Sequence, residues 1–175
     1  MRAIRDEEFE RLYAEHAPGL FAFLCYRTGN TTVAEDLLAD TCERALRARR
    51  RFDPRRGSAK TWLYAIALNC LHDHTRKRAV EGRALQRVAG GPDFVAAGEL
   101  EEIDELAQDD FDGLADRELL NDSLAALSGE EREAVSLRYG AELTVREVAK
   151  LTGEAPATIE SRVYRALDKL REAMG

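Results

Sequence analysis

The fold is decided by the stretch from Arg44 to Arg78, which reads RALRARRRFDPRRGSAKTWLYAIALNCLHDHTRKR. It begins with a basic run, breaks at Asp53-Pro54 and Gly57, and continues as an amphipathic helix that ends in a second basic cluster. Cationic side chains attract a phosphate backbone, and aromatic rings beside them can stack on unpaired bases at about 1–3 kcal/mol per base. The simpler interpretation is a core tryptophan among solvated arginines. The choice between this interpretation and nucleic-acid binding depends on the rest of the chain.

The composition predicts an all-α protein of one large or two small domains, because 175 residues with 45% apolar content contain only four prolines and no alternating β-branched runs. No apolar stretch approaches the length of a membrane span, and the N-terminus lacks a secretory apolar region. We therefore expect a cytoplasmic protein without membrane insertion. Cys25, Cys42 and Cys70 are expected to be buried free thiols.

The charge is distributed unevenly along the chain. Residues 1–78 carry a net charge of +4, residues 79–117 carry −8 and residues 118–175 carry −3, which together give the total of −7. This distribution predicts two small helical domains, 1–78 and 118–175, joined by an acidic flexible linker, 79–117, with one short helix near 99–107.

Three helices are predicted in the first domain. The first covers residues 6–27, and the second begins at Thr32 with Glu35 completing a capping box. The second helix presents an acidic face that is either a solvated surface or a docking site. The third covers residues 59–78, with Ser58 as its N-cap. We expect its exposed side to carry Lys60, Tyr64, Asn69, Asp73, Arg76 and Lys77.

Four helical segments are predicted in the second domain. The first covers 116–127, Ser128 and Glu131 cap the second, and Thr144 and Glu147 cap the third. The third helix ends at Gly153, and Pro156 begins the fourth. A short helix, a glycine turn and a longer helix are typical of a helix-turn-helix. The exposed front of the last helix is expected to carry Ala157, Thr158, Glu160, Ser161, Arg162, Tyr164 and Arg165, which suit a major groove.

At these motifs a family resemblance becomes clear. The segment LNDSLAALSGEEREAVSLRYGAELTVREVAKLTGEAPATIESRVYRALDKLREAM resembles the −35-binding domain of bacterial sigma factors. The segments FERLYAEHAPGLFAFL, AEDLLADTCERALRA and FDPRRGSAKTWLYAIALNCLHDHTRKR resemble the sigma domain that binds core polymerase and melts the −10 element. Since there is no intervening third domain, the resemblance is to the extracytoplasmic-function (ECF) subclass.

The resemblance implies a role for each surface of the first domain. The helix 34–47 corresponds to the surface that grips the clamp helices of the largest polymerase subunit, through Glu35, Asp36, Leu38, Asp40 and Glu43. The loop 52–59 corresponds to the loop that captures a flipped −10 base, and the helix 60–78 to the one that holds the non-template strand. The implied −10 contacts are Phe52, Arg55, Arg56, Ser58, Lys60, Trp62, Tyr64, Asn69, Arg76 and Lys77.

It also implies partners for the rest of the chain. The acidic linker corresponds to a segment that threads the polymerase channels, and the polymerase flap and an anti-sigma factor are further expected partners. The implied −35 contacts are Thr158, Glu160, Ser161, Arg162, Tyr164 and Arg165, with Arg162 on phosphate.

Three positions depart from the family pattern. Glu160 stands where many members have Lys or Arg, Ala155 leaves the recognition helix without a side-chain cap, and Ala39 replaces a common Gln. The −35 sequence preference is therefore not transferred from the family.

Two other functions compete with a sigma factor. A conventional helix-turn-helix regulator that acts without polymerase would leave the aromatic-basic helix and the acidic face without functions. An enzyme using Cys70 with His74, or Asp73 with His72, is not favoured, because there is no phosphate-binding loop or completed triad. No cofactor or metal is expected, since Cys70, His72 and His74 do not make a full ligand set.

Overall fold

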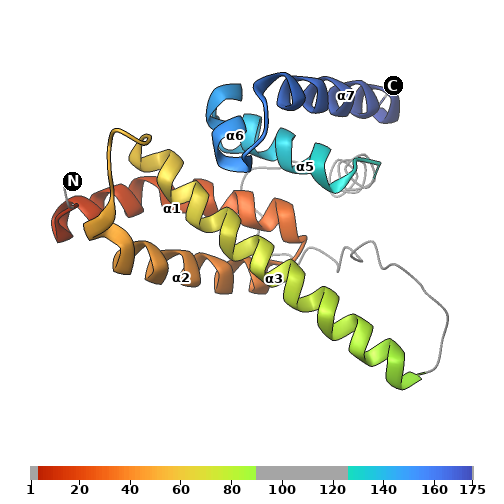
Figure 1. Cartoon of the computed structure of the whole chain (residues 1–175), viewed down its shortest axis with the longest axis horizontal. Coiled ribbons are helices and arrows are strands. Elements are labelled where there is room, and N and C mark those ends of the chain that lie inside the picture. The colour runs from red at the N-terminus through yellow and green to blue at the C-terminus, as the bar shows by residue number, and fades with distance from the viewer. Residues whose placement is uncertain (1–3, 90–125, 175) are drawn as a thin grey trace.

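The computed structural model describes residues 4–89 and 126–174, and these parts contain helices but no strand. The N-terminal unit consists of α1 (Asp6–Thr28), α2 (Thr31–Ala48), the short 3-10 turn η1 (Arg49–Arg51) and α3 (Ala59–Ala89) (Figure 1). The C-terminal unit consists of α5 (Gly129–Val135), the π-helical turn η2 (Ser136–Gly140), α6 (Val145–Thr152) and α7 (Pro156–Met174). The predicted all-α fold is confirmed. The helices predicted near 99–107 and over most of 116–127 lie outside the described residues.

Most helix ends follow from local sequence, as expected. Two of the three predicted capping boxes form: Ser128 Oγ accepts from the Glu131 N–H at 3.2 Å, and Thr144 Oγ1 accepts from the Glu147 N–H at 3.3 Å. Gly153 adopts a left-handed conformation, with φ of 74°, where α6 ends. These local interactions satisfy backbone groups that the first and last helical turns leave unpaired.

Two predicted helix boundaries are wrong. Asn30, rather than Thr32, caps α2, because its Oδ1 accepts from the Val33 N–H at 2.9 Å and the helix begins one residue later. The third helix continues to Ala89 rather than ending at Arg78. A single glycine, Gly82, costs about 1 kcal/mol in a helix, and the good helix formers around it outweigh that penalty.

The core of the N-terminal unit lies between α1, α2 and α3. Leu20, Phe23 and Leu24 of α1 are fully buried, as is Leu63 of α3. The rings of Phe23 and Tyr64 meet edge to face, with centroids 5.6 Å apart, an arrangement that aromatic pairs favour. Only one side of α3 takes part in this core, so its other sides are available for contacts elsewhere.

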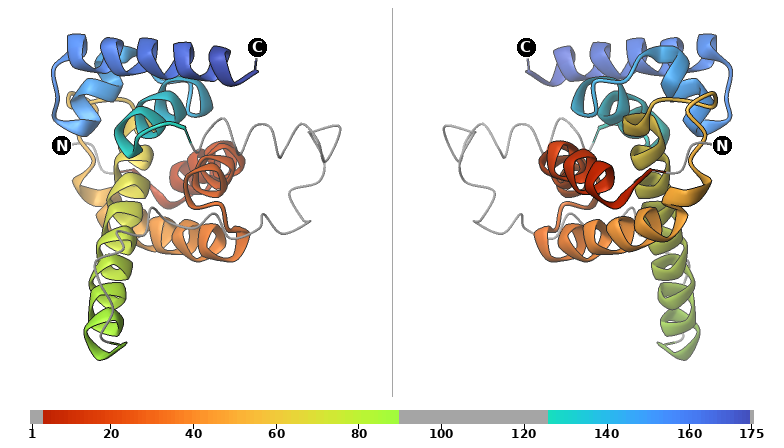
Figure 2. Two further views of the ribbon diagram at one scale, coloured as in Figure 1. Left: turned by 90° about the vertical axis from the view of Figure 1, so that its right-hand side faces the viewer. Right: turned by 90° about the vertical axis from the view of Figure 1, so that its left-hand side faces the viewer.

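The C-terminal unit packs directly on the N-terminal unit. Leu137, Leu143 and Val148 belong to the same contiguous apolar cluster as Phe23. Figure 2 shows α5–α7 lying over α1 and the first half of α3, while the second half of α3 projects away from the body. The two helical units therefore share buried surface in this structure.

The predicted exposure of Tyr64 is wrong, because its side chain is buried, with 2% of its surface exposed. Leu68 and Leu71 follow it at i+4 and i+7, and these positions share one side of a helix. Burial raises the pKa of the Tyr64 phenol to about 12. A Cβ added at Gly19 of α1 would lie 3.0 Å from the Tyr64 hydroxyl oxygen, and no other described neighbour lies within 4 Å of it. Gly19 thus makes room for the Tyr64 hydroxyl.

We expect Gly19→Ala to stabilise the protein only when the Tyr64 hydroxyl is absent. Alanine is about 1 kcal/mol better than glycine inside a helix, but in the wild type the new methyl group meets the hydroxyl. In a Tyr64→Phe background the free energy of unfolding should rise by about 1 kcal/mol, measured by urea denaturation. Equal effects of Gly19→Ala in the two backgrounds would contradict this packing.

Candidate nucleic-acid interface

The loop before α3 is shaped by Asp53. Its carbonyl accepts from the Arg56 N–H and its Oδ1 accepts from the Arg55 N–H, each at 3.0 Å. Such side chain-to-backbone bonds stabilise a tight turn. The turn leaves the side chains of Arg55 and Arg56 exposed, so two cations stand at the entrance to the helix.

An aromatic pair joins the same loop to α3. The rings of Phe52 and Trp62 are tilted against each other, with centroids 5.4 Å apart, and both residues are half-buried. Ser58 caps α3, as predicted, because its Oγ accepts from the Thr61 N–H at 3.1 Å. A supported ring pair beside a positive charge has the chemistry of a platform for unpaired bases.

The exposed side of α3 continues this polar surface. Asn69 and Arg76 are exposed and are separated by seven residues, about two helical turns, so they lie on one side of the helix. Lys77 is also exposed, and Lys60 is half-buried. Tyr64, by contrast, cannot reach a ligand in this conformation, because it is buried against Phe23.

The predicted acidic face of α2 is solvent-exposed. Glu35, Asp36, Asp40 and Glu43 are all exposed, while Leu38 is half-buried and packs against the core. Glu43 forms an ion pair with Arg47 on its own helix. The surface therefore combines carboxylates with an apolar edge, as a docking surface for a basic partner requires.

A surface ion pair links α2 and α3. Arg44 Nη1 donates to Asp73 Oδ2 at 2.9 Å, and this hydrogen bond lowers the pKa of the Asp73 carboxyl. Asp73 is thus already paired on α3.

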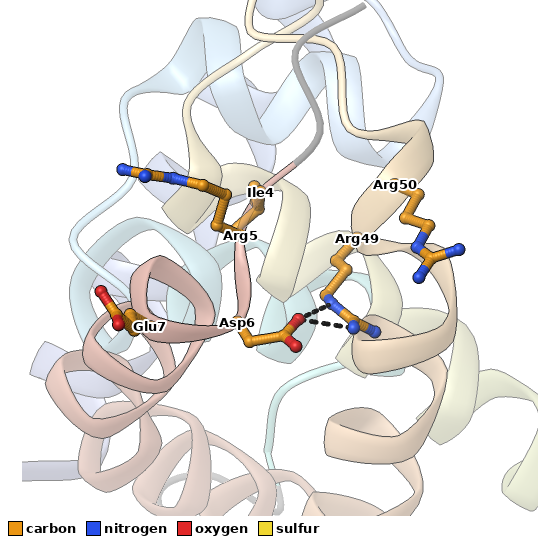
Figure 3. A pocket seen from close by; sticks show the side chains of 6 residues that line it. All are labelled: Ile4, Arg5, Asp6, Glu7, Arg49 and Arg50. Atoms are coloured by element: carbon orange, nitrogen blue, oxygen red, sulfur yellow. Dashed lines mark hydrogen bonds and ion pairs between the residues drawn. The ribbon is translucent and has the colours of Figure 1, made fainter.

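An open hollow lies where the N-terminus meets the basic run, lined by Ile4, Arg5, Asp6, Glu7, Arg49 and Arg50 (Figure 3). Arg49 donates to the Asp6 carboxylate, with an Nε to Oδ1 distance of 2.9 Å. This pair links the start of α1 to η1, so Arg49 has a structural partner. Arg50 and Arg51 remain exposed.

The C-terminal unit has the predicted helix-turn-helix. Val148 of α6 packs with Ile159 and Val163 of α7 in the buried cluster. Tyr164 is 66% exposed, so its ring is available for contact with a ligand. The other exposed residues predicted on this front are Ala157, Thr158, Glu160, Ser161 and Arg165.

Arg162 does not lie on the exposed front, so that prediction is wrong. Its side chain is 14% exposed and forms ion pairs with Glu154, in the turn before α7, and with Glu130 of α5 at 2.9 Å. A guanidinium can hold two carboxylates because it has several donors in a fixed plane. Arg162 thus holds α7 against the rest of its unit.

The cysteines are free thiols, but the predicted burial holds only for Cys70, because Cys25 and Cys42 are half-buried. Burial raises the pKa of the Cys25 and Cys70 thiols, which is the opposite of what a reactive thiolate requires. Within residues 4–89 and 126–174, no three His, Cys, Asp or Glu side chains are grouped closely enough to hold a metal ion. No helix in the same residues is long and apolar enough to cross a membrane.

The contacts between the two units were missed by the sequence reasoning. Thr61 Oγ1 of α3 donates to Glu147 Oε1 of α6 at 3.0 Å. Hydrogen bonds from the Thr144 N–H, its hydroxyl and Thr61 lower the pKa of Glu147, so it is ionised at neutral pH. Such partners lie more than 80 positions apart, and no periodicity of the sequence could have paired them.

Two family models match the chain, Sigma-70 region 2 over residues 12–80 and Sigma-70, region 4 over residues 117–170. The chain is 34% identical to RNA polymerase sigma factor CarQ of Myxococcus xanthus, over 100% of this chain and 95% of that protein. It is 32% identical to the ECF RNA polymerase sigma factor RpoE of Cereibacter sphaeroides, over 99% of this chain and 92% of that protein.

A solved structure supports the same relationship. The sigma factor RpoE in complex with the anti-sigma factor NepR, from Bartonella quintana, matches with a TM-score of 0.73 and 27% identity. The match covers 96% of this chain and 97% of that one. The sequence resemblance is therefore confirmed, and it extends to the arrangement of the helices.

We expect Arg162→Met to weaken the C-terminal unit rather than to remove a phosphate contact. The loss of ion pairs to a half-buried and an exposed carboxylate should lower the free energy of unfolding by about 1 kcal/mol. The slope of log affinity for duplex DNA against log salt concentration should stay unchanged. A lost phosphate contact would reduce that slope by about 0.9 without changing stability.

Proposed function

The chain belongs to the extracytoplasmic-function (ECF) family of RNA polymerase sigma factors, and on that premise we propose which surfaces hold polymerase and which hold promoter DNA. As a sigma factor it binds core polymerase and directs transcription initiation at specific promoters, and it is not an enzyme. A helix-turn-helix regulator that acts without polymerase is not favoured.

The acidic face of α2 is the polymerase-binding surface. Glu35, Asp36 and Asp40 are exposed together on one helix beside the half-buried Leu38. Carboxylates around an apolar contact suit the clamp helices of the largest polymerase subunit, with Glu43 at the edge. The flap of polymerase is the corresponding partner of the C-terminal unit.

The loop before α3 and the exposed side of α3 form the −10 interface. The observation that carries this assignment is the Phe52–Trp62 ring pair beside the exposed Arg55 and Arg56. Unpairing a base costs a few kcal/mol, and stacking on a ring together with phosphate neutralisation offsets that cost. Along α3 the remaining contacts are Ser58, Lys60, Asn69, Arg76 and Lys77, while Tyr64 supports the helix from the core.

The front of α7 forms the −35 interface. Thr158, Ser161 and Arg165 are exposed on one side of a helix that follows a helix-turn-helix turn, and such a helix enters the major groove. Tyr164 and Glu160 lie beside them, and Glu160 can accept a hydrogen bond from a cytosine amino group.

An anti-sigma factor is the proposed regulatory partner. The solved neighbour from Bartonella quintana was crystallised with an anti-sigma factor, and its similarity extends over nearly the whole chain. We place the protein in the cytoplasm, where polymerase and chromosome are found.

Reversing the charge of Asp36 and Asp40 together, by Asp36→Lys with Asp40→Lys, should abolish co-purification with core polymerase, because both carboxylates then repel a basic partner. The control is the same double reversal on α1, Glu10→Lys with Glu15→Lys, which lies outside the proposed surface. Circular dichroism should show both variants folded. Full retention of the α2 variant on core enzyme would reject the assignment.

Arg165→Ala should weaken promoter binding by roughly 1–3 kcal/mol and relax the base preference at one −35 position. The measurement is transcription from a promoter library by purified core polymerase with each variant, with start sites mapped. Arg171→Ala, an exposed arginine of the same helix outside the proposed front, is the matched control. An unchanged −35 preference in the Arg165 variant would refute its role.

A further inference from the structure

One carboxylate joins both DNA-binding units of this sigma factor. Glu133 Oε2 of α5 lies 3.3 Å from Arg27 Nη2 of α1 and 2.7 Å from His72 Nε2 of α3, and both groups donate to it. The Glu133 side chain is 17% exposed and that of Arg27 is 12% exposed. Arg27 Nη1 also donates to the Gly129 carbonyl at 3.4 Å. A single anion thus ties the C-terminal unit to two separate N-terminal helices.

Further polar contacts lie along the same side of α3. Thr61, eleven positions before His72, donates to Glu147 of α6. Lys150 of α6 donates to the Arg56 carbonyl in the loop before α3. The C-terminal unit is therefore held against the loop and helix that we assign to the −10 element.

Apolar packing accompanies these contacts. Tyr26 of α1 packs against a small cluster of Leu127, Val135 and Ala166. Burial lowers the pKa of the Arg27 guanidinium, while Glu133 opposes that change. The buried cation therefore depends on Glu133, because an unpaired charge in such a place is strongly destabilising.

This arrangement is incompatible with occupancy of both promoter elements. The −10 and −35 positions are roughly 25 base pairs apart, and at about 3.4 Å per pair this is on the order of 85 Å. In the structure α3 and α6 are in contact through Thr61 and Glu147. A segment with the length of residues 90–125 reaches at most roughly 120 Å when fully extended, so the covalent connection permits the required separation.

We propose that the structure is a closed state of the free sigma factor, locked by Glu133 between Arg27 and His72, and that this lock must break before both promoter elements are bound. The proposal rests on the assignment of α3 and α7 to the two elements. Any partner that binds only the open state must supply the free energy of opening, so the lock reduces the affinity of the free protein for promoter DNA.

The opening can be measured with a thiol placed between the units. Thr61→Cys puts a thiol of similar side-chain volume at a position that is 6% exposed and contacts α6. Its alkylation rate, resolved by mass spectrometry, follows the open population when opening is fast relative to labelling. Adding Glu133→Gln should increase that rate about tenfold or more, since a hydrogen-bonded charge is removed.

Two controls make each outcome decisive. Glu172→Gln, at an exposed position of α7, should leave the Thr61→Cys rate unchanged. Cys70, which is 2% exposed in the N-terminal core, reports global unfolding and should stay slow in all variants. Equal Thr61→Cys rates with and without Glu133→Gln would overturn the proposal, as would a parallel rise in labelling of Cys70.

A charge swap tests the pairing itself. Arg27→Glu and Glu133→Arg should each accelerate Thr61→Cys labelling, and the double variant should recover much of the slow rate. Additive acceleration in the double variant would refute a direct lock. These measurements contain neither polymerase nor DNA, so their failure is distinguishable from failure of the promoter assignments.

Discussion

The structure depends on the burial of one side of α3 against α1. Leu63, Tyr64 and Leu68 are buried on this helix, and the edge-to-face contact of Tyr64 with Phe23 sets the distance between α3 and α1. Once that side is fixed, the direction of every other α3 residue follows from the helical repeat. Asn69 and Arg76 then face solvent, while Thr61 and His72 face the C-terminal unit.

The side of α3 that faces the C-terminal unit adjoins the side assigned to DNA. The loop before α3 combines both functions in a few residues, because the Arg56 carbonyl accepts from Lys150 while its side chain remains exposed. The same short segment thus contacts the C-terminal unit through its backbone and presents cations through its side chains. Interdomain contact and promoter contact are therefore neighbours in space as well as in sequence.

Features set by local chemistry could be predicted from the sequence. The capping boxes at Ser128 and Thr144 and the glycine turn at Gly153 involve residues within a few positions of one another, and each satisfies backbone groups nearby. The boundary errors at Asn30 and Ala89 are of the same local kind. At the first, the sequence offers two possible caps, Asn30 and Thr32, and Asn30 is the one used. At the second, a single glycine does not end the helix.

Tyr64 and Arg162 could not be placed in this way, because their partners are remote. Tyr64 has a polar hydroxyl, but the space left by Gly19 allows the whole side chain to enter the core. The sequence pattern predicts Arg162 on a cationic face of the helix. Its side chain instead forms ion pairs with Glu154 and with Glu130, which is distant in sequence, and these pairs keep it largely buried. For Arg162 the carboxylate partners decided the direction of the side chain, whereas Tyr64 follows the helical repeat that it shares with Leu68 and Leu71, and Gly19 supplies the space for its hydroxyl.

The contact between the units has the chemistry of an interface that can open. Separating ionised partners restores their hydration, so an ion pair adds less net stability than its Coulomb energy suggests. Removing one partner, however, leaves the other charge unpaired in a poorly hydrated place. A lock such as Glu133 with Arg27 and His72 therefore selects one geometry without making the closed state irreversible. Separating a larger apolar interface would expose apolar surface to water without restoring favourable hydration. Polymerase and promoter would then have to supply more binding free energy to separate the two units.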